Sequence, residues 1–430
     1  MPENQILHGI CNDRCLRHGR ESGQLVHRRN EAMNRFRFVD LFSGIGGFHQ
    51  AMEQLGGECV LAAEIDSFCN KVYQENYGMS SDRNVQELDA LKDIPPHEVL
   101  CAGFPCQAFS KAGKQEGLGD ETRGTLFFEI ARILRAQHSP YIILENVRNL
   151  VSHDHGNTWK IIKKVLKECG YRLTEKPLIV SPHQLGIPQL RERVIILGKY
   201  EPDNVEEPLS IKLDAKKKKN DNSIYDVITE EPVEEKYYIS EYEEMVLAAW
   251  DEFYQGINRK VIGFPIWADF FRYEKAPEDF PDWKRGFVEK NMTLYQENKQ
   301  FIDQWLEKYH QLEGFAPTHH KMEWQAGTMI DSVWEGVIQL RPSGVRIKAP
   351  TCFPALVAMV QIPIIGRYRR RLTVEEAGRL QSFPNPVRER TGEDRDSFVC
   401  DESDQQAYKQ FGNSVNVEVV KYCARKLFAL

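Results

Sequence analysis

The alternation of short apolar runs with helix-like stretches over residues 36–200 limits most strongly what this chain can fold into. The runs are predicted strands at residues 37–41, 59–65, 99–102, 141–144 and 194–197. Helical periodicity fills the intervals, as in FHQAMEQLGG, TLFFEIARILRAQ and TWKIIKKVLKECG. Strands that alternate with helices predict parallel βαβ units, and therefore an α/β sheet with helices on both faces.

The length of 430 residues predicts two or three domains, and the pattern changes where their boundaries are expected. Residues 1–35 lack apolar periodicity and are predicted to be a poorly ordered extension, in which Met33 is a candidate initiator whose upstream residues are dispensable. Residues 36–200 form the α/β domain, residues 201–366 a smaller irregular domain, and residues 367–430 a return segment that completes both.

Aromatic and capping residues support these boundaries. Six of the seven tryptophans fall between Trp250 and Trp334, which indicates a second core, and most of them are expected inside it. In LTVEEAGRLQSF, Thr373 is a predicted N-cap with Glu376 at the third helical position. The final segment FGNSVNVEVVKYCARKLFAL is predicted to be a closing helix that packs back on the first domain.

Composition excludes several classes of protein. With 41% hydrophobic and 28% charged residues, the chain is typical of a soluble globular protein, and it has neither a membrane-length apolar run nor a secretory leader, so we expect a cytoplasmic location. Ten scattered cysteines predict reduced thiols, and the Cys11/Cys15 pair lacks the second pair that a zinc site needs, so no metal is expected. A net charge of −7 argues against a uniformly basic surface, although one cleft could still be positive.

Polar residues follow the predicted strands at the sheet edge where α/β proteins bind ligands. A glycine-rich turn, DLFSGIGGF, follows the first strand, and Glu64 ends the second; alone, these two features also fit a structural turn and a solvated carboxylate. The turn lacks the GxGxxG spacing, which disfavours a nicotinamide-dependent oxidoreductase. The later strand ends carry Cys106 in GFPCQAFS, Glu145 and Asn146 in ENVRNL, and Gln189, Arg191 and Arg193 in GIPQLRERVIIL. Their common position predicts convergence on one cleft.

These blocks, in this order, resemble the DNA cytosine-5 methyltransferases of bacterial restriction–modification systems from Phe36 to the C-terminus. The matching blocks are FVDLFSGIGGF, Glu64, GFPCQAFS, RGTLFFEIARIL, ENVRNL, GIPQLRERVIIL, RRLTVEEAGRLQSFP and QFGNSVNVEVV. The resemblance implies an S-adenosylmethionine-dependent, Rossmann-like sheet with helices on both faces, joined to a smaller target-recognition domain at residues 201–366.

The resemblance also implies roles for individual residues. Cys106 attacks cytosine C6, Glu145 supports that attack at N3, Arg193 holds O2, and Arg191 and Gln189 support them. S-adenosylmethionine, released as S-adenosylhomocysteine, is expected to contact Phe42, Gly44, Gly46, Glu64, Ile65, Asn84, Val85, Leu126 and Asn413. Asn84 is a departure, because an aspartate is frequent in the family at the position that meets the adenine amino group.

A duplex hides the reacting atoms of cytosine, so the target base is expected to flip into the pocket, with residues 109–125 as the loop that closes behind it. Arg341, Arg346 and Lys348 are candidate contacts to phosphates or guanine edges, whereas lysines 216–219 more often form a solvated run. Positive charge should therefore gather in a cleft that runs from Arg191 and Arg193 to Arg341 and Arg346.

The function implied is sequence-specific methylation of double-stranded DNA by a monomeric enzyme at the nucleoid, which protects host DNA from a separately encoded restriction endonuclease. An RNA cytosine-5 methyltransferase is one alternative, which the aromatic segment disfavours. A catalytically inactive DNA-binding homologue is another, and it should have lost Cys106 or Glu145, both of which are present. The recognition sequence itself cannot be read from the chain.

Overall fold

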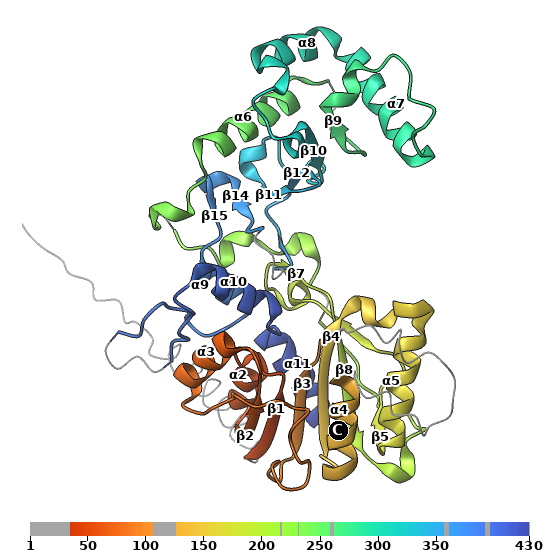
Figure 1. The fold of residues 1–430 in the computed structure, drawn as a ribbon, viewed down its shortest axis with the longest axis vertical. Helices are drawn as coiled ribbons and strands as arrows, with labels where there is room; N and C mark the ends of the chain where they lie inside the picture. The colour runs from red at the N-terminus through yellow and green to blue at the C-terminus, as the bar shows by residue number, and fades with distance from the viewer. Residues whose placement is uncertain are drawn as a thin grey trace, which may run out of the picture.

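A computed structural model describes residues 35–105, 126–215, 217–230, 232–258, 262–356, 361–391 and 396–429. The molecule is elongated, with one sheet at one end of the long axis and a second sheet with its helices toward the other end (Figure 1). Over the described ranges, no helix combines the length and the apolar character needed to cross a bilayer.

The first sheet has seven strands and carries the blocks singled out in the sequence. Its strands are β1 (Phe36–Leu41), β2 (Gly57–Ala63), β3 (Val99–Gly103), β4 (Tyr141–Val147), β5 (Tyr171–Leu173), β6 (Leu178–Val180) and β8 (Arg193–Tyr200). They run in the order β2-β1-β3-β4-β8-β5, with β6 paired to β8. The first four are parallel, as the strand–helix alternation predicts.

The prediction of parallel pairing is wrong for the last predicted strand. β8 runs antiparallel to β4, with Glu145 opposite Ile195, and both β5 and β6 also pair antiparallel with β8. The chain enters β8 from the short strands β5 and β6 rather than from a crossover helix, so it returns in the opposite direction. Periodicity alone does not reveal this, because antiparallel pairing depends on long-range partners.

Helices cover both faces of this sheet, which confirms the predicted fold class. They are α2 (Gly47–Glu53), α3 (Ser67–Tyr77), α4 (Leu126–Gln137), α5 (Asn157–Glu168) and α11 (Val417–Phe428). The apolar side chains of α2, α3 and α11 share one buried cluster with Phe38 and Cys101. Those of α4 and α5 share the cluster on the opposite face with Val39 and Leu100.

The turn between β1 and α2 needs glycine for two reasons. Gly46 has φ 84°, a left-handed conformation that favours glycine, and a Cβ on it would lie 2.3 Å from the Tyr77 ring. A Cβ on Gly47 would lie 2.6 Å from the Ser414 hydroxyl oxygen. The turn is therefore packed between α3 and the far end of the chain.

The second sheet has six strands in the order β15-β14-β11-β12-β10-β9. These are β9 (Ile266–Trp267), β10 (Lys321–Trp324), β11 (Val337–Arg341), β12 (Gly344–Lys348), β14 (Ile364–Ile365) and β15 (Arg370–Arg371). The accompanying helices are α6 (Glu241–Gly256), α7 (Asp282–Glu297) and α8 (Lys299–Lys308). Residues of α6 and α8 pack on this sheet in a third apolar cluster of its own.

The tryptophans of this second core are divided between its interior and its edge. Trp250, Trp305 and Trp324 are buried, as expected for core residues. Trp267 and Trp334 are half-buried beneath the Lys321 and Arg369 cations, whereas the remaining one, Trp283, is 63% exposed.

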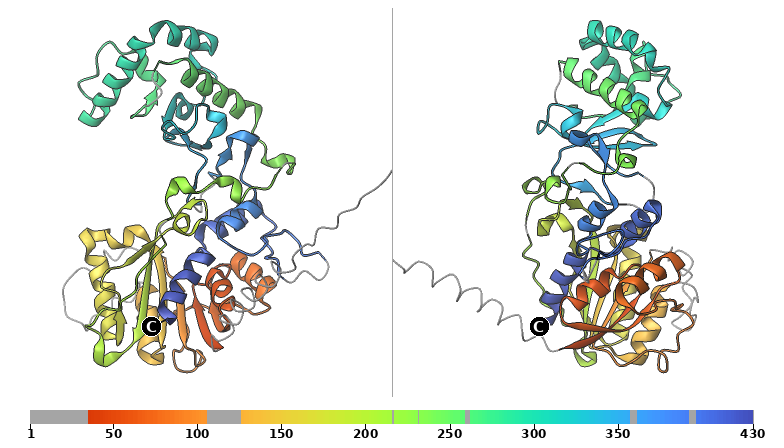
Figure 2. Two further views of the ribbon diagram at one scale, coloured as in Figure 1. Left: turned by 180° about the vertical axis from the view of Figure 1, so that it is seen from behind. Right: turned by 90° about the vertical axis from the view of Figure 1, so that its left-hand side faces the viewer.

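The C-terminal segment connects the two sheets. Helices α9 (Val374–Leu380) and α10 (Asp404–Asn413) lie between the two ends of the molecule (Figures 1 and 2). At the start of α9, the predicted cap is confirmed, because Thr373 Oγ1 accepts from the Glu376 amide at 3.2 Å. The predicted closing helix is broken at residues 414–416: α10 ends at Asn413, and α11 starts after Asn416, whose Oδ1 accepts from the Val419 amide at 3.0 Å.

Further contacts connect the two ends of the molecule. Strand β7 (Gln189–Leu190) pairs in parallel with β13 (Phe353–Pro354), which belongs to the segment that follows β12. Leu209 and Ile224 pack in the first apolar cluster beside α11, not in the third cluster. The segment after β8 therefore packs on the first sheet before the chain enters the second one.

Candidate functional site

The carboxyl ends of β3 and β4 lie side by side and bring two of the motif segments together. Gly103 pairs with Glu145, and a Cβ on Gly103 would lie 3.8 Å from Glu145 Oε2. Asn146 is buried, and its Nδ2 donates to the Phe104 carbonyl oxygen at 2.8 Å. The segment that enters the Pro-Cys motif is thus tied to the strand end that carries Glu145.

The described part of this segment ends at Pro105. Cys106, the predicted nucleophile, lies outside the described residues, and so do the predicted loop at residues 109–125 and the Cys11/Cys15 pair. The bond from Asn146 is structural, and its only sign in the sequence is the position of Asn146 directly after Glu145 at a strand end.

Glu145 forms an ion pair at the base of the site. Its Oε1 lies 2.9 Å from Nε of Arg193, and the side chains of Glu145 and Arg193 are 11% and 19% exposed. Burial raises the pKa of Glu145 above its ordinary value, while the charges of Arg193 and Arg191 oppose that rise. The net upward direction makes this carboxyl group easier to protonate than an ordinary glutamate, while its pairing with Arg193 opposes protonation.

Arg191 connects three parts of the chain beneath Glu145. Its Nη1 donates to the Leu356 carbonyl oxygen at 3.0 Å and its Nη2 to the Ser414 carbonyl oxygen at 2.7 Å. Burial lowers its pKa to about 9, so it stays charged at neutral pH. Arg191 therefore acts as a buried cross-link that fixes the positions of both carbonyl segments relative to β8.

Gln189 lies one step further from Glu145. It is fully buried, and its Oε1 accepts from Gln381 Nε2 at 3.3 Å. Glu145, Arg191 and Arg193 line one cavity of about 10 Å³ together with Asn416, and Gln189 does not take part in that lining. The structure thus brings three of the five residues with predicted catalytic roles to one cavity and places Gln189 in β7, opposite Phe353 of β13.

The glycine turn and Glu64 meet at the carboxyl ends of β1 and β2. Glu64 Oε2 accepts from the Gly44 amide at 2.9 Å, and Oε1 accepts from the amides of Ile65 and Asp66 at 2.8 and 2.9 Å. Phe42, at the start of the turn, has φ 57°, a left-handed conformation that is unusual for a bulky residue. These bonds fix the Glu64 carboxylate at the strand end, and among the described residues they occupy three of its four acceptor positions.

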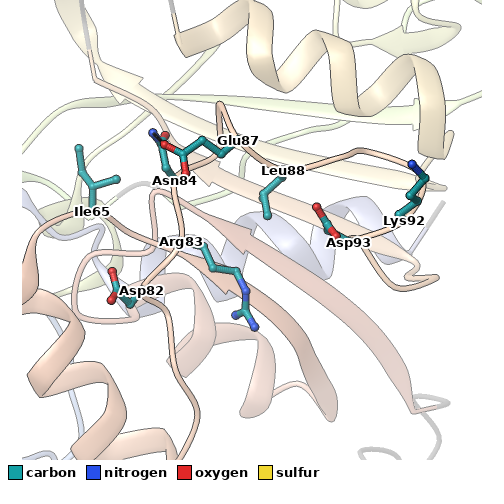
Figure 3. A pocket seen from close by; sticks show the side chains of 8 residues that line it. All are labelled: Ile65, Asp82, Arg83, Asn84, Glu87, Leu88, Lys92 and Asp93. Carbon is teal, nitrogen blue, oxygen red and sulfur yellow. Dashed lines mark hydrogen bonds between the residues drawn. The ribbon is translucent and has the colours of Figure 1, made fainter.

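A pocket of about 700 Å³ begins at Ile65, the residue after Glu64 (Figure 3). Ile65 and Asn84 are two of the residues that line it, and Ile65 is 74% exposed although it is apolar. Asn84 Oδ1 accepts from the Gln86 amide at 3.1 Å, and its Nδ2 donates to Glu87 Oε1 at 3.0 Å. Val85, which follows Asn84, is buried in the cluster that contains Phe104.

The two remaining predicted cofactor residues come from distant segments. Leu126 is the first residue of α4 and is half-buried. Asn413 ends α10 directly before Ser414 and Val415, which would touch a Cβ on Gly47. The fold thus brings residues 413–415 to the glycine turn, across more than 360 positions of sequence.

These features fit a nucleoside with a charged amino-acid tail. Glu64 supplies an open acceptor for a hydroxyl group, Ile65 an exposed apolar face for a flat ring, and Asn84 an amide for a ring substituent. Ser43 Oγ in the turn is buried without a hydrogen-bond partner among the described residues, which leaves a polar atom for the tail.

Comparison with known proteins identifies the family. The family model for C-5 cytosine-specific DNA methylases matches residues 36–429, nearly the whole chain. The chain belongs to the C-5 cytosine-specific DNA methylase family. It is accordingly a DNA cytosine-5 methyltransferase, and S-adenosylmethionine is the methyl donor of this family.

Relatives of similar length agree with this assignment. The chain is 32% identical to the Type II methyltransferase M.AluI of Cellulosimicrobium cellulans, over 92% of each chain. It is 34% identical to M.HpaII of Haemophilus parainfluenzae, over 91% of this chain and 89% of the relative. With M.HhaI of Haemophilus parahaemolyticus it shares 42% identity over 40% of this chain and 52% of the relative.

Solved structures show the same fold. A triple mutant of DNMT2 from Spodoptera frugiperda superposes with a TM-score of 0.50 at 21% identity, over 91% of this chain and 99% of that one. At 21% identity this match establishes the fold and nothing more specific.

In this methyltransferase, the predicted DNA-facing residues lie on the second sheet. Arg341 ends β11, and Arg346 and Lys348 lie on the neighbouring strand β12. Arg346 is paired with Glu323 of β10 and is therefore not a free cation, which the sequence did not indicate. Lys219 lies close enough to Lys348 for its charge to lower the pKa of that residue, after the larger effect of burial.

Proposed function

We propose that the enzyme methylates one short sequence of double-stranded DNA and thereby protects host DNA from a separately encoded restriction endonuclease. It acts as a monomer in the cytoplasm, at the nucleoid. Its Type II relatives and its second sheet, which carries Arg341, Arg346 and Lys348, support a duplex substrate. The observation that carries the proposal is the pairing of Gly103 with Glu145, which sets the described residues that lead to Cys106 beside a buried carboxyl group and two arginines.

The chemistry begins at Cys106. Cytosine C5 is a poor nucleophile, so the Cys106 thiolate first forms a bond to C6, and the ring electron pair moves toward C5 and N3. After C5 has taken the methyl group, the proton on C5 is lost. The C6–sulfur bond then breaks, which restores the aromatic ring and the free cysteine. The target base leaves the duplex to reach this position.

Glu145 and Arg193 stabilise the activated ring. Because burial raises the pKa of Glu145, its carboxyl group can donate a proton or hydrogen bond to N3 as negative charge builds there. Arg193, 2.9 Å from Glu145, provides a cation for cytosine O2. Arg191 and Gln189 are positioning residues. Arg191 holds the carbonyl oxygens of Ser414 and Leu356 by hydrogen bonds, and Gln189 accepts a hydrogen bond from Gln381.

The cofactor site is assigned to the glycine turn and the adjoining pocket. Phe42, Gly44 and Gly46 surround the amino-acid tail, Glu64 holds the ribose hydroxyls, and Ile65, Asn84 and Val85 enclose the adenine. Leu126 and Asn413 complete the enclosure. S-adenosylmethionine supplies an electrophilic methyl group when it is bound there. The side-chain carbonyl oxygen of Asn84 accepts a hydrogen bond from the adenine amino group. The aspartate that is frequent in the family at this position accepts the same bond but carries a negative charge, which asparagine lacks.

The first prediction tests the nucleophile. Cys106→Ser should abolish methyl transfer and leave S-adenosylmethionine binding near the wild-type value, because an alcohol is far less acidic than a thiol. Duplex DNA carrying 5-fluorocytosine should become covalently attached to the wild-type enzyme and not to the variant. Gel-shift under denaturing conditions and calorimetric titration measure the two properties.

Cys69→Ser is the matched control, because Cys69 is half-buried on α3 and should be catalytically silent. Wild-type turnover in Cys106→Ser would contradict the adduct. Transfer to transfer RNA in preference to duplex DNA would contradict the substrate assignment.

A further inference from the structure

The second sheet has one apolar and one polar face at strands β10, β11 and β12. On β11 and β12, Ile338 and Ile347 face the core formed with α6 and α8. Gln339 and Arg346 are paired across the same strands and point to the other side. Val337, which shares that side with Gln339, packs in the first apolar cluster. The polar face therefore continues at Val337 into the cluster that also contains apolar residues of α11.

Arg346 is held on this face by a carboxylate. Its Nε and Nη2 both donate to Glu323 Oε2, at 2.9 and 2.7 Å, and the two residues are paired directly across β10 and β12. The side chains are 20% and 15% exposed. A guanidinium held along its Nε–Nη2 edge keeps the Nη1–Nη2 edge for a second bidentate partner.

Two further residues on this face, Gln339 and Arg341, carry buried polar atoms. Among the residues that the structure describes, the buried atoms Gln339 Oε1 and Arg341 Nε have no hydrogen-bond partner. A buried polar atom without a hydrogen-bond partner lowers the stability of a folded protein and is uncommon. Two such atoms on one face therefore indicate a ligand that supplies the missing hydrogen bonds. The ligand must be polar and must reach this face of the second sheet.

We propose that Arg346 determines specificity by reading a guanine of the recognition sequence, with Glu323 as the positioning residue that fixes its orientation. The inference rests on the proposed duplex DNA substrate and goes beyond it. Guanine presents O6 and N7 as paired acceptors in the major groove, and the free edge of a guanidinium matches them. Because Glu323 neutralises Arg346, the pair is poorly suited to neutralise a phosphate, which needs net positive charge.

The test measures site preference rather than rate alone. Wild-type enzyme, Arg346→Ala, Arg346→Lys and Glu323→Gln methylate a duplex library in which the positions around the target cytosine are randomised, and 5-methylcytosine is read by sequencing. We expect a guanine requirement of the wild type to relax at one position by about 5- to 150-fold in all three variants, with other positions unchanged. Arg346→Lys should relax it although the charge is retained, because lysine lacks the planar fork.

Arg371→Ala is the matched control. Arg371 forms a comparable pair with Glu243, at 32% and 15% exposure, between β15 and α6. The Arg371→Ala variant should leave the site preference unchanged. If Arg346→Ala unfolds because Glu323 loses its partner, the double variant Arg346→Ala/Glu323→Gln removes both charges and serves in its place.

Three outcomes would contradict this inference, and only the first of them would also contradict the proposed function. A wild-type enzyme that methylates no duplex in the library would overturn both. An active wild type, with variants that lose rate equally at all sequences and keep the same preference, would overturn only the role of Arg346 in reading a base. A full rescue by Arg346→Lys would instead indicate a phosphate contact and would also overturn it.

Discussion

At the residue scale, Asp40 is the buried acid that departs furthest from ordinary behaviour. It lies fully buried in β1, between β2 and β3. Burial raises its pKa well above the usual value, an interaction with the His49 backbone opposes the rise, and the charge of Glu64 adds to it. In the unfolded chain this group ionises above about pH 4, whereas the folded protein keeps the proton. Its contribution to stability therefore falls as the pH rises from about 4 toward its folded pKa.

Asp40→Asn should consequently stabilise the fold, and its advantage should grow with pH by up to about 1.4 kcal/mol per unit. Urea unfolding at several pH values between 5 and 8 measures the difference. Asp214→Asn is the control of opposite sign, because hydrogen bonds from Lys426 and Tyr422 lower the pKa of Asp214 to about 2. Its stabilising effect is present above about pH 4 and is lost as the pH falls toward 2. A constant difference for Asp40→Asn across pH would contradict the buried neutral acid.

The pH dependence of catalysis depends on Glu145 and Arg193. If protonated Glu145 assists at N3, the rate should decline on the alkaline side as this carboxyl group loses its proton. Arg193 lowers the pKa of Glu145, so Arg193→Gln should slow the reaction and shift the alkaline decline to higher pH. Single-turnover rates across pH measure both effects. Arg148→Gln, which removes an exposed partner of Glu192, should leave the decline in place. An unshifted decline in Arg193→Gln would assign it to another group.

At the scale of elements, α9 owes its position to a fully buried ion pair. Arg370 of β15 donates from Nη1 and Nη2 to the two oxygens of Glu376, each at 2.9 Å, and both side chains are 0% exposed. The same carboxylate accepts from the amides of Thr373 and Thr229, each at 2.7 Å. One carboxylate thus joins α9 to β15 and to the segment that leads into the second sheet.

Glu376→Gln removes the charged, bidentate partner of the buried Arg370 guanidinium, so it should cost about 3 kcal/mol of unfolding free energy. Urea unfolding followed by tryptophan fluorescence measures it, because the tryptophans are concentrated in the adjoining second core. Glu244→Gln removes only the exposed pair with Arg369 and should cost less than about 1 kcal/mol. Equal costs for the two variants would mean that the buried pair contributes little.

The limits of prediction from sequence also appear at this scale. The cap at Thr373 was predictable because its partner, Glu376, is three residues away. The break before α11 was not, because it is fixed from a distance: the Val417 amide donates to the Gln381 carbonyl oxygen at 3.0 Å, and Ser414 packs against Gly47. Likewise, the candidate catalytic residues were found from their positions at the ends of predicted strands. The pairing of Arg346 with Glu323 could not be found in this way, because it joins two strands through residues 23 positions apart.

At the scale of the whole molecule, a net charge of −7 has to be reconciled with a polyanionic substrate. The reconciliation is local, because basic residues gather on one side of the second sheet. Lys348 lies among Arg346, Lys219 and Arg341, and burial together with these cations lowers its pKa. Of these four cations, Arg346 is neutralised by Glu323. Lys348, which lies on the same strand, is therefore a candidate for net attraction to phosphates.

Lys348→Gln should therefore weaken binding to all duplex sequences alike and make the slope of log affinity against log salt shallower by about 0.9. Fluorescence anisotropy with cognate and scrambled duplexes over a range of salt concentrations measures it. Lys160→Gln, on the exposed side of α5, removes the same charge from another part of the surface and should leave the slope unchanged. Arg346→Ala should show the complementary behaviour, a loss confined to the cognate duplex with little change of slope. If both variants change the slope equally, Arg346 and Lys348 share one electrostatic role, and the division of the polar face into a base-reading pair and a phosphate contact is wrong.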